Sequence, residues 1–357
     1  MIDGVISSNT VLPILEDFLF EIKGGKLTVF STDLETSMSA TFDVEAKEDG
    51  KIAIPAKILL NILKSLPEQP LTFNIDEQSY SIEITSDNGK YKLTGENGDD
   101  FPRIPVAEEI KDLKLSSAVI ANAINKCLFA VGSDELRPAM TGVNFELSSE
   151  GINFVSTDAH KLVRYKRFDA KSNKATSFIV PRKALSLLHG ALPSEETQVK
   201  ISYNSSNAFF TFGNVNLICR LIDARFPDYN AVIPIDNPYK LVINTSDILN
   251  SLKRLIIFAN KTTHQVSLGL KGSELNISAR DLDFSNEANE HLVSNYSGED
   301  LEISFNGRFL IEMLSAMNAE EVQFEFSTPT RASILSSTKK DDKEDVLMLV
   351  MPIMVNV

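Results

Sequence analysis

The sequence reads FVSTDAHKL at residues 154–162 and FIVPRKALSLLHGALP at residues 178–193, and a similar pair of stretches occurs once before it and once after it. The earlier pair is VFSTDLE at 29–35 with IAIPAKILLNILKSLP at 52–67, and the later pair is ISARDLD at 277–283 with ISFNGRFLIEMLSAMN at 303–318. Steps of 125 and 123 residues separate the aspartates at positions 33, 158 and 281, and steps of 126 and 125 separate Pro55, Pro181 and Asn306. Because two independent landmarks share one period, the sequence predicts three copies of one domain.

The period places the three copies at residues 1–112, 113–236 and 237–357, each of ordinary domain size. Alternating apolar and polar residues predict strands, and amphipathic runs predict helices at 55–66, 114–131, 181–192, 247–261 and 306–318. The second and third copies therefore read helix, strands, helix, strands. The first copy is N-terminally short, because its opening residues leave no room for a full opening strand and helix; either its start is truncated relative to the other copies or the domain itself is abbreviated. We expect an α+β fold of three repeated domains.

Composition indicates an ordinary soluble protein, with 43% hydrophobic and 24% charged residues among 357. Cys127 and Cys219 lie in apolar surroundings without CxxC or Cys/His spacing, which favours buried thiols in a reducing cytoplasm. The apolar runs are too short to cross a membrane, and the N-terminus lacks the pattern of a signal peptide. A cytoplasmic protein is therefore expected.

The charged residues are distributed unevenly along the chain, and their distribution points to a different function than the net charge does. A net charge of −14 argues against nucleic acid binding, but the predicted helices carry ten of the 35 basic residues and only two of the 49 acidic ones, Asp247 and Glu312. The ten are Lys57, Lys64, Lys114, Lys126, Arg182, Lys183, Lys253, Arg254, Lys261 and Arg308. A simple solvent-facing role for Lys and Arg would predict Glu on the same helices, where it is nearly absent. The pattern favours helices that face a polyanion through its phosphates, without reading sequence.

Catalytic motifs are absent from the sequence. The four histidines are scattered, and no HExxH, GxSxG, Walker or GxGxxG pattern occurs. Asp33, Asp158 and Asp281 follow a strand in each copy, which favours a role in turns over a carboxylate cluster. His160 lies near Asp158 without a nearby nucleophile, which favours a surface or pocket role. We therefore expect no catalytic residue, no metal, no cofactor and no enzyme activity.

Over essentially its whole length the chain resembles the bacterial DNA polymerase III β sliding clamp family. The matching stretches are LPIL at 12–15, STDL at 31–34, DFP at 100–102, STDAHKL at 156–162, VPRK at 180–183, RFPDY at 225–229 and VMPI at 350–353. The resemblance implies a head-to-tail, ring-shaped homodimer, with helices lining the hole and antiparallel sheets outside. It further implies that the ring encircles double-stranded DNA without sequence specificity, in the bacterial cytoplasm at the nucleoid.

The resemblance also implies two sets of functional residues. A peptide pocket between the second and third domains corresponds here to Met140, Thr157, Ala159, His160, Lys161, Leu162, Pro227, Ala231, Val232, Leu349, Val350, Met351, Pro352 and Ile353. The DNA-facing residues expected are Lys57, Lys64, Lys126, Arg137, Arg182, Lys183, Lys253, Arg254 and Lys261. The implied partners are the replicative polymerase, the clamp loader, repair polymerases, mismatch-repair proteins and a second copy of the chain, with no membrane.

Two alternatives from other functional classes remain open at this stage. A repeat-built DNA repair enzyme would need a metal or nucleophile constellation, which the sequence lacks. A DNA-independent peptide-binding scaffold would sediment as a single species of 39.5 kDa.

Overall fold

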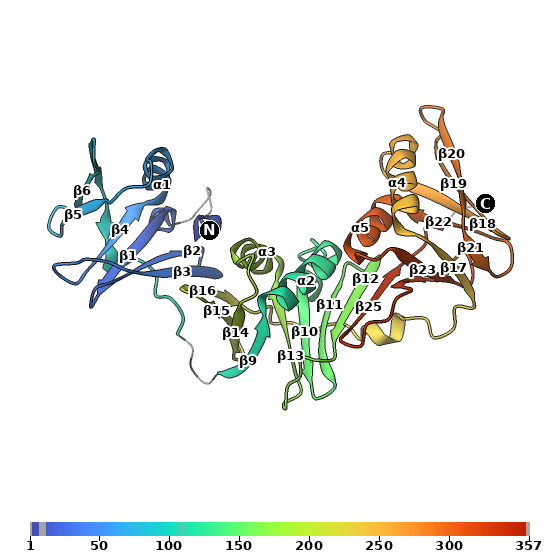
Figure 1. The fold of residues 1–357 in the computed structure, drawn as a ribbon, viewed down its shortest axis with the longest axis horizontal. Helices are drawn as coiled ribbons and strands as arrows, with labels where there is room; N and C mark the ends of the chain where they lie inside the picture. The colour runs from blue at the N-terminus through green and yellow to red at the C-terminus, as the bar shows by residue number, and fades with distance from the viewer. Residues whose placement is uncertain (1, 7–11, 107, 109, 355–357) are drawn as a thin grey trace. The chain divides into compact units, whose positions relative to one another are not determined.

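The computed structural model describes residues 2–6, 12–106, 108 and 110–354. The chain forms two compact units, Met1–Ala121 with Lys183–Leu221, and Asn122–Arg182 with Ile222–Val357. Each unit contains one large antiparallel sheet and one smaller sheet (Figure 1). The division between the units therefore passes through the middle repeat.

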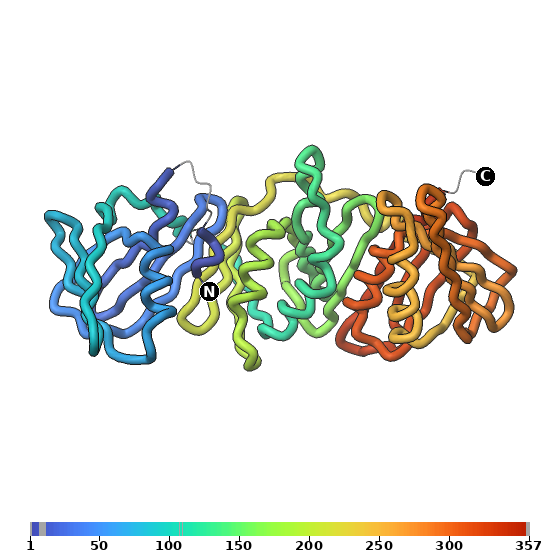
Figure 2. Tube along the Cα trace, turned by 90° about the horizontal axis from the view of Figure 1, so that it is seen from above, coloured from blue at the N-terminus to red at the C-terminus, as the bar shows by residue number. Residues whose placement is uncertain are grey.

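In the first unit, a nine-stranded sheet joins strands of the first and second repeats in the order β8-β4-β1-β2-β3-β16-β15-β14-β9. These strands are β1 (Asp17–Lys23), β2 (Lys26–Thr32), β3 (Thr36–Asp43), β4 (Gly50–Pro55), β8 (Glu96–Asn97), β9 (Lys111–Ser116), β14 (Gln198–Tyr203), β15 (Asn207–Phe212) and β16 (Val215–Arg220). The smaller sheet is β5 (Thr72–Asp76), β6 (Ser81–Thr85) and β7 (Lys90–Thr94). The two repeats meet where β3 pairs with β16, with Met38 opposite Leu217. In Figure 2 a yellow-green segment of the trace runs beside the blue first repeat.

In the second unit, another nine-stranded sheet joins the second and third repeats in the order β13-β10-β11-β12-β25-β24-β23-β17-β21. These strands are β10 (Gly142–Ser148), β11 (Gly151–Thr157), β12 (Lys161–Arg167), β13 (Thr176–Pro181), β17 (Tyr239–Asn244), β21 (Asn295–Ser297), β23 (Glu321–Phe326), β24 (Ser333–Ser337) and β25 (Glu344–Val350). The smaller sheet, in the order β20-β19-β18-β22, contains β18 (Gln265–Lys271), β19 (Glu274–Asp281), β20 (Asn286–Val293) and β22 (Leu301–Asn306). Here β12 and β25 join the repeats, with Leu162 opposite Leu349.

The structure confirms the five predicted helices, each somewhat shorter than expected. They are α1 (Ala56–Ser65), α2 (Ser117–Cys127), α3 (Arg182–Ala191), α4 (Thr245–Leu255) and α5 (Gly307–Met317). The second helix starts late because Lys114 belongs to β9. Asn244 and Asn306 cap α4 and α5, since their side chains accept hydrogen bonds from the first free backbone N–H groups. In the described part of the chain, no helix combines the length and hydrophobicity needed to cross a membrane.

The first repeat differs from the others in how its sheet is covered. In the third repeat, α4 packs on β19, β20 and α5. At the equivalent place in the first repeat, a cavity of about 310 Å³ is bordered by α1, β1, β2, β3 and the short 3-10 helix Ile2–Val5. Val5 of that short helix is buried, and Ser31 donates a hydrogen bond of 2.6 Å to the carbonyl of Ile2.

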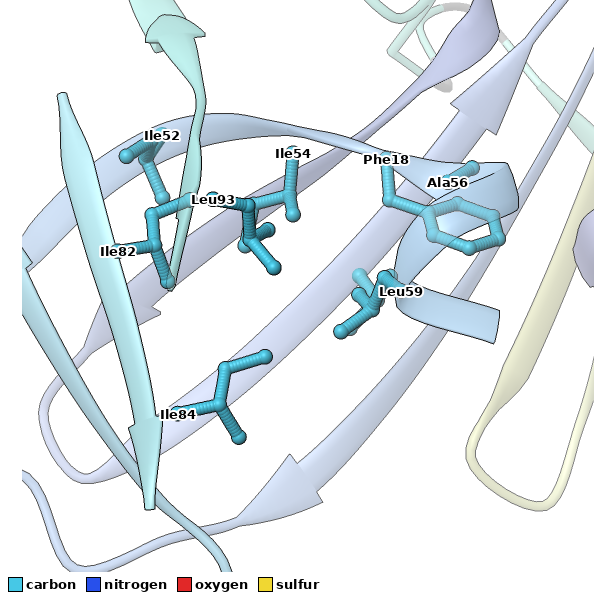
Figure 3. Close-up of a cluster of buried hydrophobic side chains, with 9 residues drawn as sticks. Phe18, Ile52, Ile54, Ala56, Leu59, Ile82, Ile84 and Leu93 are labelled. Atoms are coloured by element: carbon cyan, nitrogen blue, oxygen red, sulfur yellow. The ribbon is translucent and has the colours of Figure 1, made fainter. Parts of the chain in front are cut away.

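Apolar residues from both sheets and α1 form the core of the first repeat (Figure 3). Its buried members are Phe18, Val29, Ile52, Ile54, Ala56, Leu59, Ile82, Ile84 and Leu93. Ile82 and Ile84 alternate along β6 with partly exposed residues, as expected for a strand with one face in the core. The small sheet is therefore held to α1 and the large sheet by burial of apolar side chains.

A carboxylate is buried at the start of β1. Asp17 is 6% exposed, and its Oδ2 atom has no hydrogen-bond partner within the described residues. Burial raises the pKa of Asp17 to about 6, with additional repulsion from Glu96 and Glu16. Because this folded-state pKa exceeds the unfolded value of 3.8, folding favours the protonated form. That stabilisation is complete below pH 3.8 and is lost as the pH rises through about 6.

The Asp17→Asn variant is therefore expected to be more stable than the wild type at pH 8, because it removes a buried charge. The expected gain in the free energy of unfolding is about 1–2 kcal/mol, falling toward zero near pH 4. Urea unfolding at both pH values measures it, with exposed Glu68→Gln as the control. An equal difference at both pH values would show that Asp17 does not titrate in this way.

Candidate functional site

Basic side chains are exposed on or beside the helices at eight of the nine expected positions. These are Lys57, Lys64, Arg137, Arg182, Lys183, Lys253, Arg254 and Lys261. Four of them form ion pairs: Lys64 with Asp3, Arg137 with Asp134, Lys183 with Asp33, and Arg254 with Glu290. Over the described residues, Lys57, Lys253, Lys261 and Arg182 form no ion pair, although the Arg182 guanidinium donates a hydrogen bond to the carbonyl of Val131. Their charges are therefore the least neutralised of the set.

Lys126 is the ninth position, and its expected DNA-facing role is corrected by the structure. Its residue is only 7% exposed, and its Nζ atom lies 5.6 Å from the centre of the Tyr165 ring. An ammonium at this distance over an aromatic face is held by the negative face of the ring. Lys126 therefore lies in the interior of the second repeat, unlike the other eight expected positions.

Several of the residues expected to form the peptide pocket lie along the junction of β12 and β25. Lys161 pairs with Val350 in the strand register, and Leu162 pairs with Leu349. Beyond the last paired residue, the backbone N–H of Met351 donates a 2.8 Å hydrogen bond to the carbonyl of His160. The backbone of the C-terminal segment is thereby fixed against the turn that precedes β12.

A buried apolar cluster lies beneath this junction. It contains Val155, Leu162, Tyr229, Ala332 and Leu349, with Phe226, Ile233 and Leu347 packed around it. The hydroxyl of Tyr229 donates a 2.7 Å hydrogen bond to Glu146, and burial together with this carboxylate raises the pKa of Tyr229. The tyrosine therefore stays neutral and fixes the end of the RFPDY stretch against β10.

The fourteen expected pocket residues divide by exposure. Thr157, Lys161, Leu162, Leu349 and Val350 are buried; Met140, Pro227, Pro352 and Ile353 are half-buried; and Ala159, His160, Ala231, Val232 and Met351 are exposed. The contacts bring Leu162 together with Leu349, and His160 together with Met351. The exposed members can contact a partner directly, while the buried ones supply the framework. An apolar surface with a few polar groups at its border is the usual form of a peptide or small-molecule site.

The side chain of Lys161 faces α5. Its Nζ atom lies 3.2 Å from Asp158 Oδ2, 3.0 Å from Glu312 Oε2 and 4.0 Å from the centre of the Phe309 ring. The His160 ring also stacks on Phe309, with centroids 6.4 Å apart. Sequence reasoning identified neither Phe309 nor Glu312, because nothing in the spacing of α5 shows which neighbour it meets.

The repeated aspartates form turns, as predicted. Asp33 Oδ1 accepts hydrogen bonds from the N–H groups of Glu35 and Thr36, and Asp158 Oδ1 accepts them from His160 and Lys161. Asp281 Oδ1 accepts one from the N–H of Asp283. These side-chain bonds are typical of Asx turns, which set the chain direction between two strands.

The two cysteines and the metal-binding residue types were also located in the structure. Cys127 and Cys219 are buried free thiols, as predicted, and burial raises the pKa of each to about 12. In the described ranges, no group of three or more His, Cys, Asp or Glu side chains has metal-binding geometry.

Comparison with known proteins gives matches along the whole chain. Three family models of the DNA polymerase III beta subunit match in order: the N-terminal domain at residues 1–105, the central domain at 114–228 and the C-terminal domain at 230–352. A beta sliding clamp of Staphylococcus epidermidis is 29% identical, covering 98% of this chain and 94% of its own. A beta sliding clamp of Staphylococcus aureus is 28% identical with the same coverage.

Solved structures agree with this fold. The DNA polymerase III subunit beta of Pseudomonas aeruginosa superposes with a TM-score of 0.94 at 25% identity, covering 99% of this chain and 96% of that one. The DNA polymerase sliding clamp of Bacillus subtilis also gives a TM-score of 0.94, covering 99% and 95% of the two chains. At 23% identity, the second likeness concerns the fold alone.

Proposed function

The chain belongs to the DNA polymerase III beta subunit family, whose members are processivity factors, and from that premise we propose that it acts as a closed ring around duplex DNA. The observation that carries the proposal is the concentration of exposed cations on the helices of an acidic protein. The family is non-catalytic, and the chain has no reaction of its own in this proposal. A repair enzyme and a DNA-independent scaffold are not favoured.

The two sheet junctions support closure of the ring by a second copy. At the first junction, β3, which precedes α1, pairs with β16, the third strand after α3. At the second junction, β12, which precedes α3, pairs with β25, the third strand after α5. The rule is that a strand before the helix of one repeat pairs with the third strand after the helix of the next repeat. The strands left over by this rule are β20 and β7. Each is the last strand of its small sheet among the described residues. A head-to-tail homodimer pairs β20 of one copy with β7 of the other, and such an arrangement closes into a ring when its rotation permits.

The charges of the two edge strands are complementary. Lys90 and Lys92 lie on β7, and Glu287 and Glu290 lie on β20. Within the chain Lys90 pairs with Glu83, Glu287 with Arg280 and Glu290 with Arg254, so these charges are shared with neighbours on the same copy. Open edge strands promote unwanted pairing, so proteins usually cover or charge them. Opposite charges here favour pairing of β7 with β20 over pairing of either strand with its own copy.

The exposed helix cations support weak contact with DNA phosphates. Lys253 and Lys261 are the clearest candidates, because neither forms an ion pair in the described part of the chain. Phosphate contacts of this kind are independent of sequence and weaken as salt rises. Tight binding is unnecessary, because a closed ring keeps its DNA by topology. The bacterial nucleoid in the cytoplasm is the place of action that this function requires.

The junction of β12 and β25 supports partner docking. Its exposed His160 and Met351 border an apolar base, and methionine adapts its shape to different ligands. Peptides with apolar and aromatic side chains fit this chemistry. The partners proposed are the replicative polymerase, the clamp loader, repair polymerases and mismatch-repair proteins.

Residence on DNA tests the ring. The protein, loaded by its clamp loader onto labelled DNA, is expected to stay far longer on closed circles than on the same DNA after linearisation, because a ring can slide off free ends. Blocking both ends of the linear DNA with a bound protein should restore the long lifetime. Lifetimes that do not depend on topology would reject encirclement.

A further inference from the structure

The two repeat junctions within the chain share a second feature besides strand pairing. In each, the turn before the junction strand contacts the helix that opens the second half of the next repeat. We call this contact the clasp: a hairpin turn containing Asp33 or Asp158, bound to the first two turns of α3 or α5. The clasp fixes the helix beside the junction as well as the sheets.

At the first junction, the clasp is one direct ion pair. Lys183 is the second residue of α3, and its ammonium binds Asp33 Oδ2. The same ammonium lies 3.4 Å from the carbonyl of Val5. The carboxylate of Asp33 thus forms the turn through Oδ1 and holds the next helix through Oδ2.

At the second junction, the clasp combines charge with an aromatic ring. Lys161 bridges Asp158 and Glu312, and its ammonium lies over the ring of Phe309. Phe309 is the third residue of α5. The turn and the helix again meet, although the basic residue now comes from the turn side.

The repeat period identifies the corresponding residues at the open edges. Helices α1, α3 and α5 start at positions 56, 182 and 307, so Lys57 matches Lys183, and Ile58 matches Phe309. Ile58 is 53% exposed. On the other side, the Asp281–Ser285 turn precedes β20 as the Asp158 turn precedes β12.

The Asp281–Ser285 turn presents a matching surface. Leu282 and Phe284 are 87% and 71% exposed, and Asp283 between them is exposed as well. Asp281 itself is buried and occupied in forming the turn. The turn therefore offers one carboxylate flanked by two apolar side chains, and α1 offers one cation beside one apolar side chain.

We propose that a third clasp forms between two copies of the chain, in which Lys57 of one copy pairs with Asp283 of the other while Ile58 packs against Leu282 and Phe284. This inference rests on the proposed homodimer and adds contacts to the pairing of β20 with β7. Opposite charges and exposed apolar side chains at both partners favour a second copy as the occupant. Lys57 consequently serves the subunit interface and not the DNA.

The test measures dimer dissociation by analytical ultracentrifugation over a dilution series. Lys57→Glu is expected to raise the dissociation constant on the order of tenfold, because it places like charges opposite each other. Lys64→Glu, exposed on the same helix, is the control and should leave the constant unchanged. Mixing Lys57→Glu with Asp283→Lys should give a heterodimer tighter than either variant alone, because one interface keeps the native Lys57–Asp283 pair and the other carries the reversed pair.

The possible results distinguish a failure of the clasp proposal from a failure of the homodimer proposal. A wild-type protein that remains at 39.5 kDa at every concentration would overturn the proposed homodimer itself. A wild-type dimer whose dissociation constant is unaffected by Lys57→Glu would overturn the clasp and leave the homodimer standing. Unfolding midpoints equal to wild type for all variants establish that the changes act at the interface.

Discussion

The Lys126→Glu variant is expected to lose about 3–5 kcal/mol of its free energy of unfolding, because it leaves an uncompensated charge in the interior. In the wild type, the ammonium of Lys126 lies 5.6 Å from the centre of the Tyr165 ring, whose hydroxyl donates a 2.5 Å hydrogen bond to Glu344. A carboxylate at the same place would face the negative side of the Tyr165 ring, and it would not gain a positively charged partner there. Guanidinium unfolding followed by circular dichroism measures the loss.

Two matched variants show that burial causes the effect. Lys253→Glu makes the same charge change on an exposed residue and is expected to shift the stability by no more than about 0.5 kcal/mol. Lys126→Met keeps the length of the side chain without the charge, and its cost should stay below about 1.5 kcal/mol. If Lys126→Glu and Lys253→Glu unfolded at the same guanidinium concentration, Lys126 would have to lie on the surface. A DNA-facing role for Lys126 would then be supported again.

The variant with both Met351→Ala and His160→Ala is expected to bind a polymerase-derived peptide about 1–3 kcal/mol more weakly, if these side chains are central contacts. Both residues are exposed, so a partner can reach them without unfolding the junction. The hydrogen bond between them joins backbone atoms, so it persists in the alanine variant. The change therefore removes the two side chains and keeps the backbone of the pocket.

Isothermal titration calorimetry with a synthetic peptide measures this affinity. Met354→Ala is the control, because Met354 is an exposed methionine of the same C-terminal segment outside the expected pocket. An affinity equal to wild type in the double variant would place the docking surface elsewhere. An equal loss in the control would point to a general effect of apolar area in this segment.

Features with a period could be predicted from the sequence. The recurrence of aspartate and of the helix starts gave three repeats and five helices, and the turns at Asp33 and Asp158 form through the side-chain bonds expected of them. Such features can be predicted because an Asx turn or a helix start depends only on interactions among a few neighbouring residues. Recognition of the family followed from short motifs in a fixed order.

Features that depend on distant neighbours could not be predicted. A lysine on an amphipathic helix is normally at the surface, but Lys126 is buried and contacts Tyr165 on β12, which is distant from it in sequence. The partners of Lys161 on α5 were missed for the same reason, because Phe309 and Glu312 are far from it in sequence. The residues of the expected pocket stay a prediction, although the structure places several of them along one strand junction.

The sheets that cross the repeat boundaries also determine how the chain can be divided. The middle repeat contributes β9 and β14–β16 to one nine-stranded sheet and β10–β13 to the other. A fragment cut at the repeat boundaries would expose β16 and β12 as bare edges, and such edges lead to aggregation. The sequence repeats and the compact units thus have different boundaries in this protein. Because β10–β13 lie between β9 and β14 in the chain, no single cut separates the two sheets, and a shortened version leaves at least one of them with a bare edge.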